Sequence, residues 1–207
     1  VLFFFFSFLY APIFFLVIFS FNSAPDFSEW ASFSLVWYKK LFNNQQLLGA
    51  IFRSFQTAFF SATLSLLLGL VCATLFSRVR SFFEVVSAIP LVVPEVIIGL
   101  SLLVFFVTME GVIGWPQGRG LTTLTIAHSL VSLAYVTMIL RTSLSEMDVS
   151  LKEAALDLGA KPQSVFFRVT LPLLFPSMFS GWVLAFILSM DDLIIASFTS
   201  GPSTSTL

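Results

Sequence analysis

The sequence predicts an all-α membrane protein. Of its 207 residues, 57% are hydrophobic and only 10% are charged, whereas a soluble domain carries about 25% charged residues. The mean hydropathy is +0.99, so the chain lacks the polar surface that water requires, and lipid is its predicted solvent. A net charge of −1 provides no basic field for nucleic acid, so nucleic-acid binding is not expected.

Runs with little or no charge are long enough to cross a bilayer, which takes about 20 helical residues. Because only helices and closed barrels satisfy their backbone in lipid, these runs are predicted to be helices. The first run could be a signal peptide, but it lacks a basic start and a small-residue cleavage site, which favours a span. The predicted spans form one domain, 1–207, and lie at about 2–20, 54–76, 85–107, 122–140 and 174–198.

The loops on the two sides of these spans differ only slightly in positive charge. The side that holds the loop at about 141–172 has six Lys and Arg residues against four on the other side, so it is predicted to be cytoplasmic. The outer loop, about 22–52, is predicted to hold a helix at the membrane surface, with a plain connecting loop as the alternative. That helix would carry Trp30, Phe33, Trp37 and Leu41 at helical spacing.

The cytoplasmic loop has the start and stop signals of a short helix. Ser150 is predicted to cap it, with Glu153 at the third helical position in a capping box. Gly159 suits the left-handed position that ends a helix. Pro162 then suits the first turn of a second short helix, which would precede the fifth span. The loop is therefore predicted to be a helix–turn–helix just inside the membrane.

Two small residues, Ala154 and Ala155, lie in the first of these helices. Small side chains let another backbone approach closely, so the loop could dock a cytosolic partner. Since short connections are the norm between helices, a loop of this length with capped helices calls for a reason. Periodicity alone leaves both docking and an ordinary connection open.

Acidic residues interrupt two predicted spans that contain no Lys or Arg. Glu95 follows Pro90 and Pro94 in the third span, and counting about 1.5 Å per residue puts it roughly 15 Å along, near the midplane. Asp191 and Asp192 lie toward the outer end of the fifth span. Intramembrane carboxylates are costly and mark ion or substrate routes, so these acids are candidates for binding a cation that passes through.

Each acid also has a structural explanation. Glu95 could be a protonated carboxyl that is hydrogen-bonded within the bundle. Asp191 and Asp192 could cap a helix or lie at the membrane interface, outside the lipid core.

Other chemistry has little support in the sequence. His128 is the one histidine, and a lone histidine in a span is more often a packing residue than a proton relay. Cys72 is the one cysteine, so no disulfide framework exists, and no ligand spacing for a metal occurs. Because no Gly-x-x-x-x-Gly-Lys run is present, the chain is predicted to have no phosphate loop and no catalytic residue of its own.

The spacing in the cytoplasmic loop resembles the EAA loop of permease subunits of binding-protein-dependent ABC importers. In that family the loop forms a coupling helix that contacts the ATPase subunit, which implies a coupling role for Glu153, Ala154, Ala155, Gly159, Leu171 and Pro172. The stretches YAPIFFLVIFSFN and LSMDDLIIASFTSGP resemble the polyamine branch of the family, the putrescine/spermidine permeases. Gly114–Pro116 and Asp192–Phe198 resemble the putrescine permeases more than the spermidine ones.

This resemblance implies a complete transport system. The chain would be a multi-pass protein of the bacterial inner (plasma) membrane that forms the translocation route for a small cation, with Glu95, Asp191 and Asp192 as substrate-binding candidates. Its implied partners are ABC ATPase subunits at the cytoplasmic loop, a second permease subunit and an extracytoplasmic substrate-binding protein. ATP and Mg²⁺ would bind the partner ATPase, and this chain would hold no cofactor.

The family fold has six spans, whereas five are visible in this sequence. The chain begins at Val1 and ends at Leu207 in a stretch rich in Ser and Thr, so we expect truncation at both ends, with a sixth span beyond the last residue. A secondary transporter or channel that couples cations through its carboxylates remains an alternative function. It would have broken helices in both halves, whereas prolines interrupt a span in one half.

Overall fold

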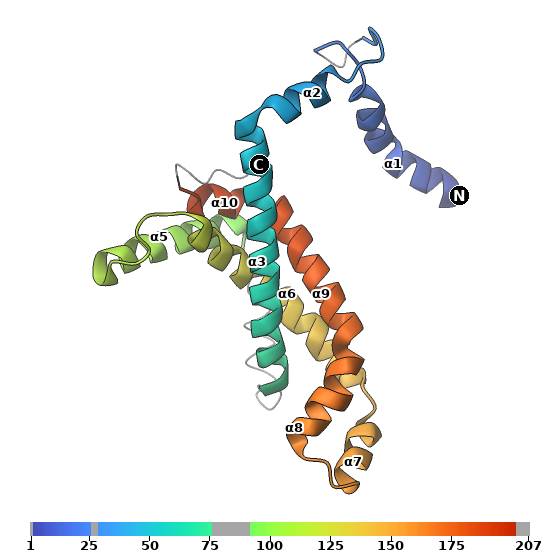
Figure 1. Ribbon diagram of the computed structural model, residues 1–207, viewed down its shortest axis with the longest axis vertical. Coiled ribbons are helices and arrows are strands. Elements are labelled where there is room, and N and C mark those ends of the chain that lie inside the picture. Colours follow the sequence, from blue (N-terminus) through green and yellow to red (C-terminus); the bar gives the residue numbers. More distant parts are fainter. Residues whose placement is uncertain (1, 26–28, 76–91, 202–207) are drawn as a thin grey trace. The chain divides into compact units, whose positions relative to one another are not determined.

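The computed structural model describes residues 2–25, 29–75 and 92–201 (Figure 1). The chain divides into two compact units, Val1–Gly49 and Ala50–Leu207, and each is described by itself. Within the described ranges every regular element is a helix, apart from an isolated bridge between Asn22 and Phe33. The predicted all-α fold is therefore confirmed.

The first unit contains α1 (Leu2–Phe19) and α2 (Val36–Asn43). α1 coincides with the first predicted span. Its side chains are described from Phe4 onward, and Phe4–Phe19 forms an apolar helix shorter than the other candidate spans.

The predicted surface helix of the outer loop is shorter than its aromatic spacing indicated. Trp30 and Phe33 precede α2 and are not helical. The buried Asn22 organises this part instead, since its Nδ2 donates to the Glu29 carbonyl at 2.7 Å. Trp37 Nε1 donates to the Asn22 carbonyl at 2.9 Å. These hydrogen bonds hold the preceding residues in a loop, so only the second half of the predicted helix forms.

In the part of the chain that the structure describes, four helices are long and apolar enough to cross a membrane: Gln45–Thr74, Glu95–Ile113, Leu121–Glu146 and Pro162–Asp191. They correspond to α3 (Gln45–Leu75), α5 (Glu95–Ile113), α6 (Leu121–Glu146) and the helix that ends with α9 (Leu171–Asp191). A short helix, α10 (Leu193–Thr199), follows α9. With α1 as a fifth, shorter apolar helix, these elements fit the predicted membrane fold.

The predicted spans 54–76 and 122–140 are too short, since α3 begins at Gln45 and α6 continues to Glu146, and two further spans have wrong bounds. The third, 85–107, begins as α5 only at Glu95, because Pro94 is extended with ψ of 135° and precedes the helix; residues 85–91 lie outside the described ranges. The fifth, 174–198, is interrupted at Asp192, whose ψ of 91° separates α9 from α10. Charge-free runs mark where lipid is tolerated, and they do not mark where the backbone turns.

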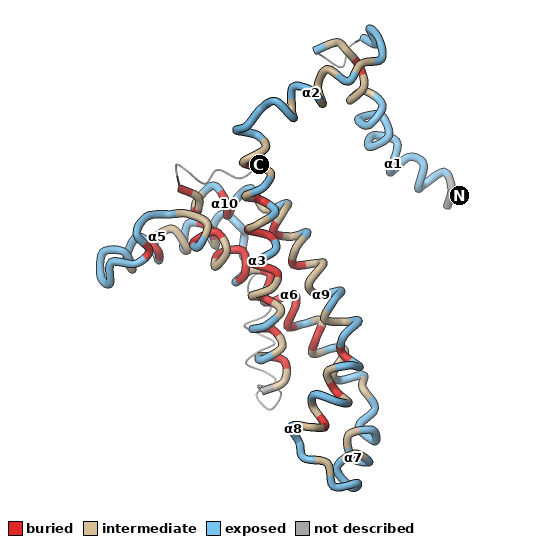
Figure 2. The backbone as a smooth tube through the Cα atoms, in the orientation of Figure 1, coloured by how far each residue is buried: buried red, intermediate tan, exposed pale blue. Residues whose placement is uncertain are grey.

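The second unit has two packed regions along α6 (Figure 2). One lies where α6 meets α3 and α9, around the fully buried Val136 and Ala185. The other lies where α6 meets α5 and α10, around Phe106, Ala127 and Ile195. α6 is therefore the common support of both helix pairs.

The cytoplasmic loop is shorter than predicted, since the residues between helical spans are 147–161 and not 141–172. α6 continues to Glu146, and α7 (Val149–Asp157) occupies most of the connection. α8 (Pro162–Val165), a π-helical turn η1 (Phe166–Thr170) and α9 then follow without a break. The predicted second short helix is therefore the first part of the last long span. Pro162 does occupy the first turn of α8, as predicted.

Candidate functional site

The start of α7 is capped by Asp148, not by Ser150 as the sequence indicated. The Asp148 carboxylate accepts a hydrogen bond from the Ser150 backbone N–H at 2.9 Å. Hydrogen bonds from the backbone and the hydroxyl of Ser150 lower the pKa of Asp148. Because the helix begins at Val149, Glu153 is no longer at the third helical position, and the predicted capping box does not form.

The end of α7 is a left-handed turn at Gly159, as predicted, with φ of +83°. The Ala160 N–H donates to the Ala155 carbonyl at 3.1 Å, and the Gly159 N–H donates to the Leu156 carbonyl at 2.8 Å. This pair of bonds is the Schellman pattern, which satisfies carbonyls that a helix end would otherwise leave free. An L side chain at Gly159 would be strained, since its φ is positive.

The surface of α7 is open to a partner. Every residue of this helix is described and none is buried. Glu153 and Ala154 are exposed, and Ala155 is half-buried. Large apolar side chains are also uncovered in and next to α7, namely Leu158 (89% exposed), Val149 (60%), Leu151 (47%) and Leu156 (45%). A rim of exposed apolar groups on a short helix between two spans is typical of an interaction surface.

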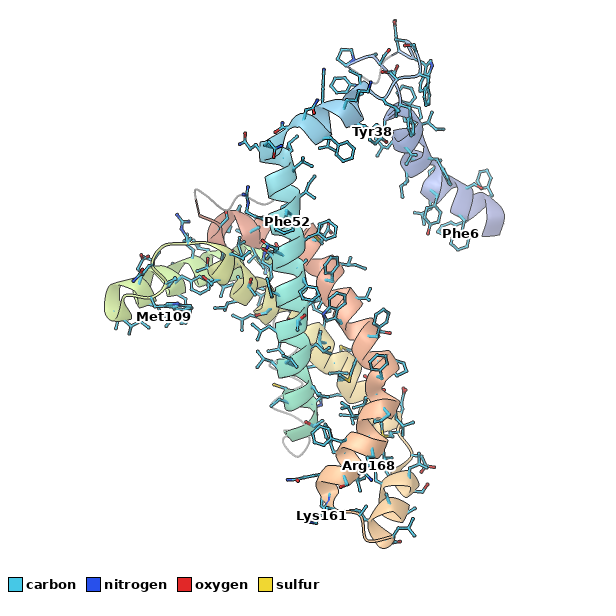
Figure 3. All side chains as sticks on the ribbon, in the orientation of Figure 1. Phe6, Tyr38, Phe52, Met109, Lys161 and Arg168 are labelled. Carbon is cyan, nitrogen blue, oxygen red and sulfur yellow. The ribbon has the colours of Figure 1, made fainter. Side chains whose placement is uncertain are left out.

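The two remaining residues of the predicted coupling set lie elsewhere on the chain. Leu171 and Pro172 are in the long helix, directly after the π-helical turn. Leu171 is half-buried and Pro172 is exposed. α7 packs against α8 and η1, the first part of this long helix. Leu171 and Pro172 directly follow that part, so they are not on the open surface of α7. Figure 3 labels Lys161, between α7 and α8, and Arg168, on the π-helical turn.

The predicted acidic residues lie at helix ends. Glu95 is exposed in the first turn of α5, and Pro94 before it is not helical, so the count along a continuous 85–107 helix does not apply. Asp191 is the exposed last residue of α9. Asp192 caps α10, and its Oδ1 accepts from the Ile195 N–H at 2.9 Å, as the structural alternative for this residue anticipated. The structure brings Glu95 and Asp192 to the starts of two helices, α5 and α10, that pack against each other.

A buried polar connection between three helices was not predicted. Ser61 Oγ of α3 donates to Ser189 Oγ of α9 at 3.0 Å, and Ser189 Oγ is 2.8 Å from His128 Nδ1 of α6. All three residues are buried, and among the described residues His128 Nε2 has no hydrogen-bond partner, so the packing role of His128 stays a prediction. Thr57, Ser61 and Ser65 recur every fourth residue along α3, which is the signal that could have indicated a polar helix–helix contact.

Comparison with known proteins assigns this architecture to a class. The family described as "Binding-protein-dependent transport system inner membrane component" matches residues 65–206, and the chain belongs to this family. It is therefore an inner-membrane permease subunit that functions with partner subunits of an ABC transporter, as the EAA-like spacing predicted.

Individual relatives extend the likeness to nearly the whole chain. The putrescine transport system permease protein PotI of Escherichia coli K12 is 45% identical over 207 residues, which cover 98% of this chain and 74% of the relative. The spermidine/putrescine transport system permease protein PotC of the same strain is 35% identical over 202 residues, or 96% of this chain and 74% of the relative. PotC of Haemophilus influenzae is 37% identical over 202 residues, or 96% and 76%. The resemblance to the polyamine branch is confirmed.

Proposed function

We propose that this subunit forms part of the route by which an ABC importer carries a polyamine, putrescine or spermidine, across the inner membrane. The observation that carries the substrate class is the 45% identity to a putrescine permease over 98% of the chain. The higher identity to the putrescine relative than to the spermidine/putrescine ones, 45% against 35% and 37%, favours putrescine.

ATP hydrolysis is proposed to take place on partner ATPase subunits that bind ATP and Mg²⁺. The open surface of α7 supports docking of such a subunit, because the described residues leave its apolar side chains exposed and Leu158 is 89% exposed. Glu153, Ala154, Ala155 and Gly159 would form or shape the docking surface. Closure of the ATPases would then move α7, and α8 and η1, against which α7 packs, would carry that movement to α9.

Glu95, Asp191 and Asp192 are proposed to guide the cationic substrate. Glu95 and Asp191 are exposed on this chain, so a second permease subunit could complete a route beside them. Carboxylates bind ammonium groups through charge-assisted hydrogen bonds. A soluble binding protein would deliver the amine from outside the membrane.

Uptake by the assembled transporter in proteoliposomes tests this function. Labelled putrescine should accumulate only with ATP on the ATPase side and with the binding protein outside. Excess spermidine should compete, whereas 1,4-butanediol should not, because it has the same carbon chain without the charge. ATP-independent uptake, or equal competition by the diol, would contradict the proposal.

A pair of acids in α5 tests the route itself. Glu95→Gln should raise the KM for putrescine several-fold, because it removes a charge from the proposed route. Glu110→Gln is the matched control, since Glu110 is exposed on the same helix and its Oε1 accepts from the Gly118 N–H at 3.0 Å, a contact that Gln preserves. An equal KM in both variants would remove Glu95 from the route.

A further inference from the structure

The helix from Pro162 to Asp191 contains one π-helical turn beside α7. Over Phe166–Thr170 a backbone N–H donates to the carbonyl five residues back rather than four; the Leu171 N–H donates to the Phe166 carbonyl. The flanking backbone remains right-handed, with φ and ψ of −63° and −41° at Val165. Single π-helical turns within α-helices amount to one inserted residue and are frequent at functional sites.

Pro172 favours the wide turn that precedes it. In a regular α-helix residue 172 would donate to the Arg168 carbonyl, but proline has no N–H, and its ring clashes with that carbonyl. A wider turn immediately before Pro172 would move the carbonyl away from the ring. Because the Pro172 side chain is exposed, its effect is on the backbone and not on core packing.

The buried side chains of the helix show what the turn does. They are Val165, Thr170, Leu174, Gly181, Ala185 and Ser189. From Thr170 onward they follow the three-to-four-residue repeat of an α-helix, but Val165 and Thr170 are five apart. At 3.6 residues per turn, five residues would leave about 140° between two side chains. The five-residue step of the π-helical turn instead returns Val165 to the buried face.

The α9 part of the helix is fixed on α6. Ser177 Oγ donates to Ser143 Oγ of α6 at 2.8 Å. A Cβ at Gly181 would lie 3.6 Å from Val136 Cγ1 of α6, so the two helices are in close contact there. Any change in the π-helical turn would therefore rotate α8, and with it α7, which packs against α8 and η1.

We propose that Pro172 is a positioning residue that holds the π-helical turn and thereby sets the rotational register between α7–α8 and α9. This inference rests on the proposed function, in which movement of α7 drives the transport cycle. If the turn relaxed to an α-helix, α8 would rotate by about 100° and shift by about 1.5 Å relative to α9. α7 would then present a different face to the ATPase.

Three variants of the assembled transporter test this role through uptake per ATP hydrolysed. Pro172→Ala should lower it at least about tenfold, because the regular helix becomes accessible. Pro176→Ala is the matched control, since Pro176 is an exposed proline of the same helix beyond the turn, and uptake should change by less than about twofold. The third variant combines Pro172→Ala with deletion of the exposed Phe167. A regular helix with one residue fewer keeps α8 in the orientation that the π-helical turn gives it, so uptake should return.

The outcomes separate the inference from the function on which it rests. Unchanged uptake in Pro172→Ala, equal losses in both proline variants, or no recovery on deletion of Phe167 would overturn the positioning role and leave the transport function intact. Recovery in the combined variant supports the role even where Pro172→Ala alone assembles poorly. Failure of the unmodified transporter to couple ATP hydrolysis to amine uptake would overturn both.

Discussion

Two short helices of this protein, α7 and α10, begin alike and are covered differently. Each is capped by an aspartate whose carboxylate accepts a backbone N–H at 2.9 Å, Asp148 in α7 and Asp192 in α10. No residue of α7 is buried, whereas Ile195, Ala196 and Thr199 of α10 are. Thr123 Oγ1 donates to the Thr199 carbonyl at 2.9 Å, so α10 is also held at its far end.

The difference separates a helix that is partly buried in its own subunit from one with no buried residue, which is the proposed docking surface. α10 packs on α5 and α6 and buries Ile195, Ala196 and Thr199, although Leu193 and Ile194 stay exposed. α7 leaves Leu158 and its neighbours uncovered. Changes at α10 should therefore act mainly on the stability of the subunit, and changes at α7 should act mainly on transport.

The largest effect on transport is expected at the turn that ends α7. Gly159→Val places a β-branched residue at a φ of +83°, which is strongly disfavoured. Uptake should fall at least about tenfold while ATP hydrolysis continues, because the docking helix is displaced. Gly118→Val is the control, since Gly118 has a φ of +84° and also has no atom near an added Cβ. Similar uptake in the two variants would break the distinction between α7 and the rest of the subunit.

The next largest effect is expected in the packing of α10 on α5. A Cβ at Gly99 would lie 2.7 Å from Phe198 Cδ2 and 3.5 Å from Ile195 Cα. Overpacking of this kind costs about 1–3 kcal/mol, so Gly99→Ala should lower the melting temperature of the detergent-purified transporter. Gly111→Ala, in the same helix with open space around it, should not. Equal melting temperatures would show that α10 is not held by this contact.

A smaller effect is expected at the start of α10, where capping and charge can be separated. Asp192→Ala should destabilise the subunit by about 0.5–2 kcal/mol, because the Ile195 N–H loses its acceptor. Asp192→Asn keeps an acceptor oxygen and should retain stability in thermal unfolding. If the asparagine variant also keeps its KM for putrescine, Asp192 is a cap and not a cation ligand.

The smallest effect is expected from low pH, which should weaken the cap at the start of α7. The lowered pKa of Asp148 means that folding of α7 favours the charged carboxylate. Its contribution is present above the ordinary pKa near 3.8 and is lost as the pH falls through the lowered value. Hydrogen exchange in α7, corrected for intrinsic rates, should rise at low pH. Asp148→Asn should remove that dependence, and an identical rise in this variant would exclude the cap as its cause.

The sequence predicted features that depend on neighbouring residues better than those that depend on tertiary contacts. Gly159 and Pro162 were assigned correctly, because backbone conformation at a turn is decided locally. The cap was misassigned because Asp148 and Ser150 are both good capping residues two positions apart. The contact between Ser61, Ser189 and His128 was missed because nothing local indicates which helix faces another.

Span bounds were limited by a different kind of signal. Charge marks the lipid boundary, but α6 continues past Arg141 to Glu146, since a helix can extend beyond the bilayer. The count that placed Glu95 near the midplane does not apply, because it assumes a continuous helix and α5 begins only after Pro94. The π-helical turn was missed because the five-residue step between Val165 and Thr170 is visible only once their burial is known.

Cysteine cross-linking at Leu158 tests the central claim, that α7 is the surface on which the ATPase acts. With Cys72→Ser removing the native thiol, Leu158→Cys should cross-link to the ATPase subunit in the assembled transporter. Val112→Cys should not cross-link to the ATPase subunit. Val112 is also well exposed (78%), but it lies in the last turn of α5, which precedes α6, whereas the cytoplasmic loop follows α6. A cross-link from Val112→Cys but none from Leu158→Cys would contradict the account.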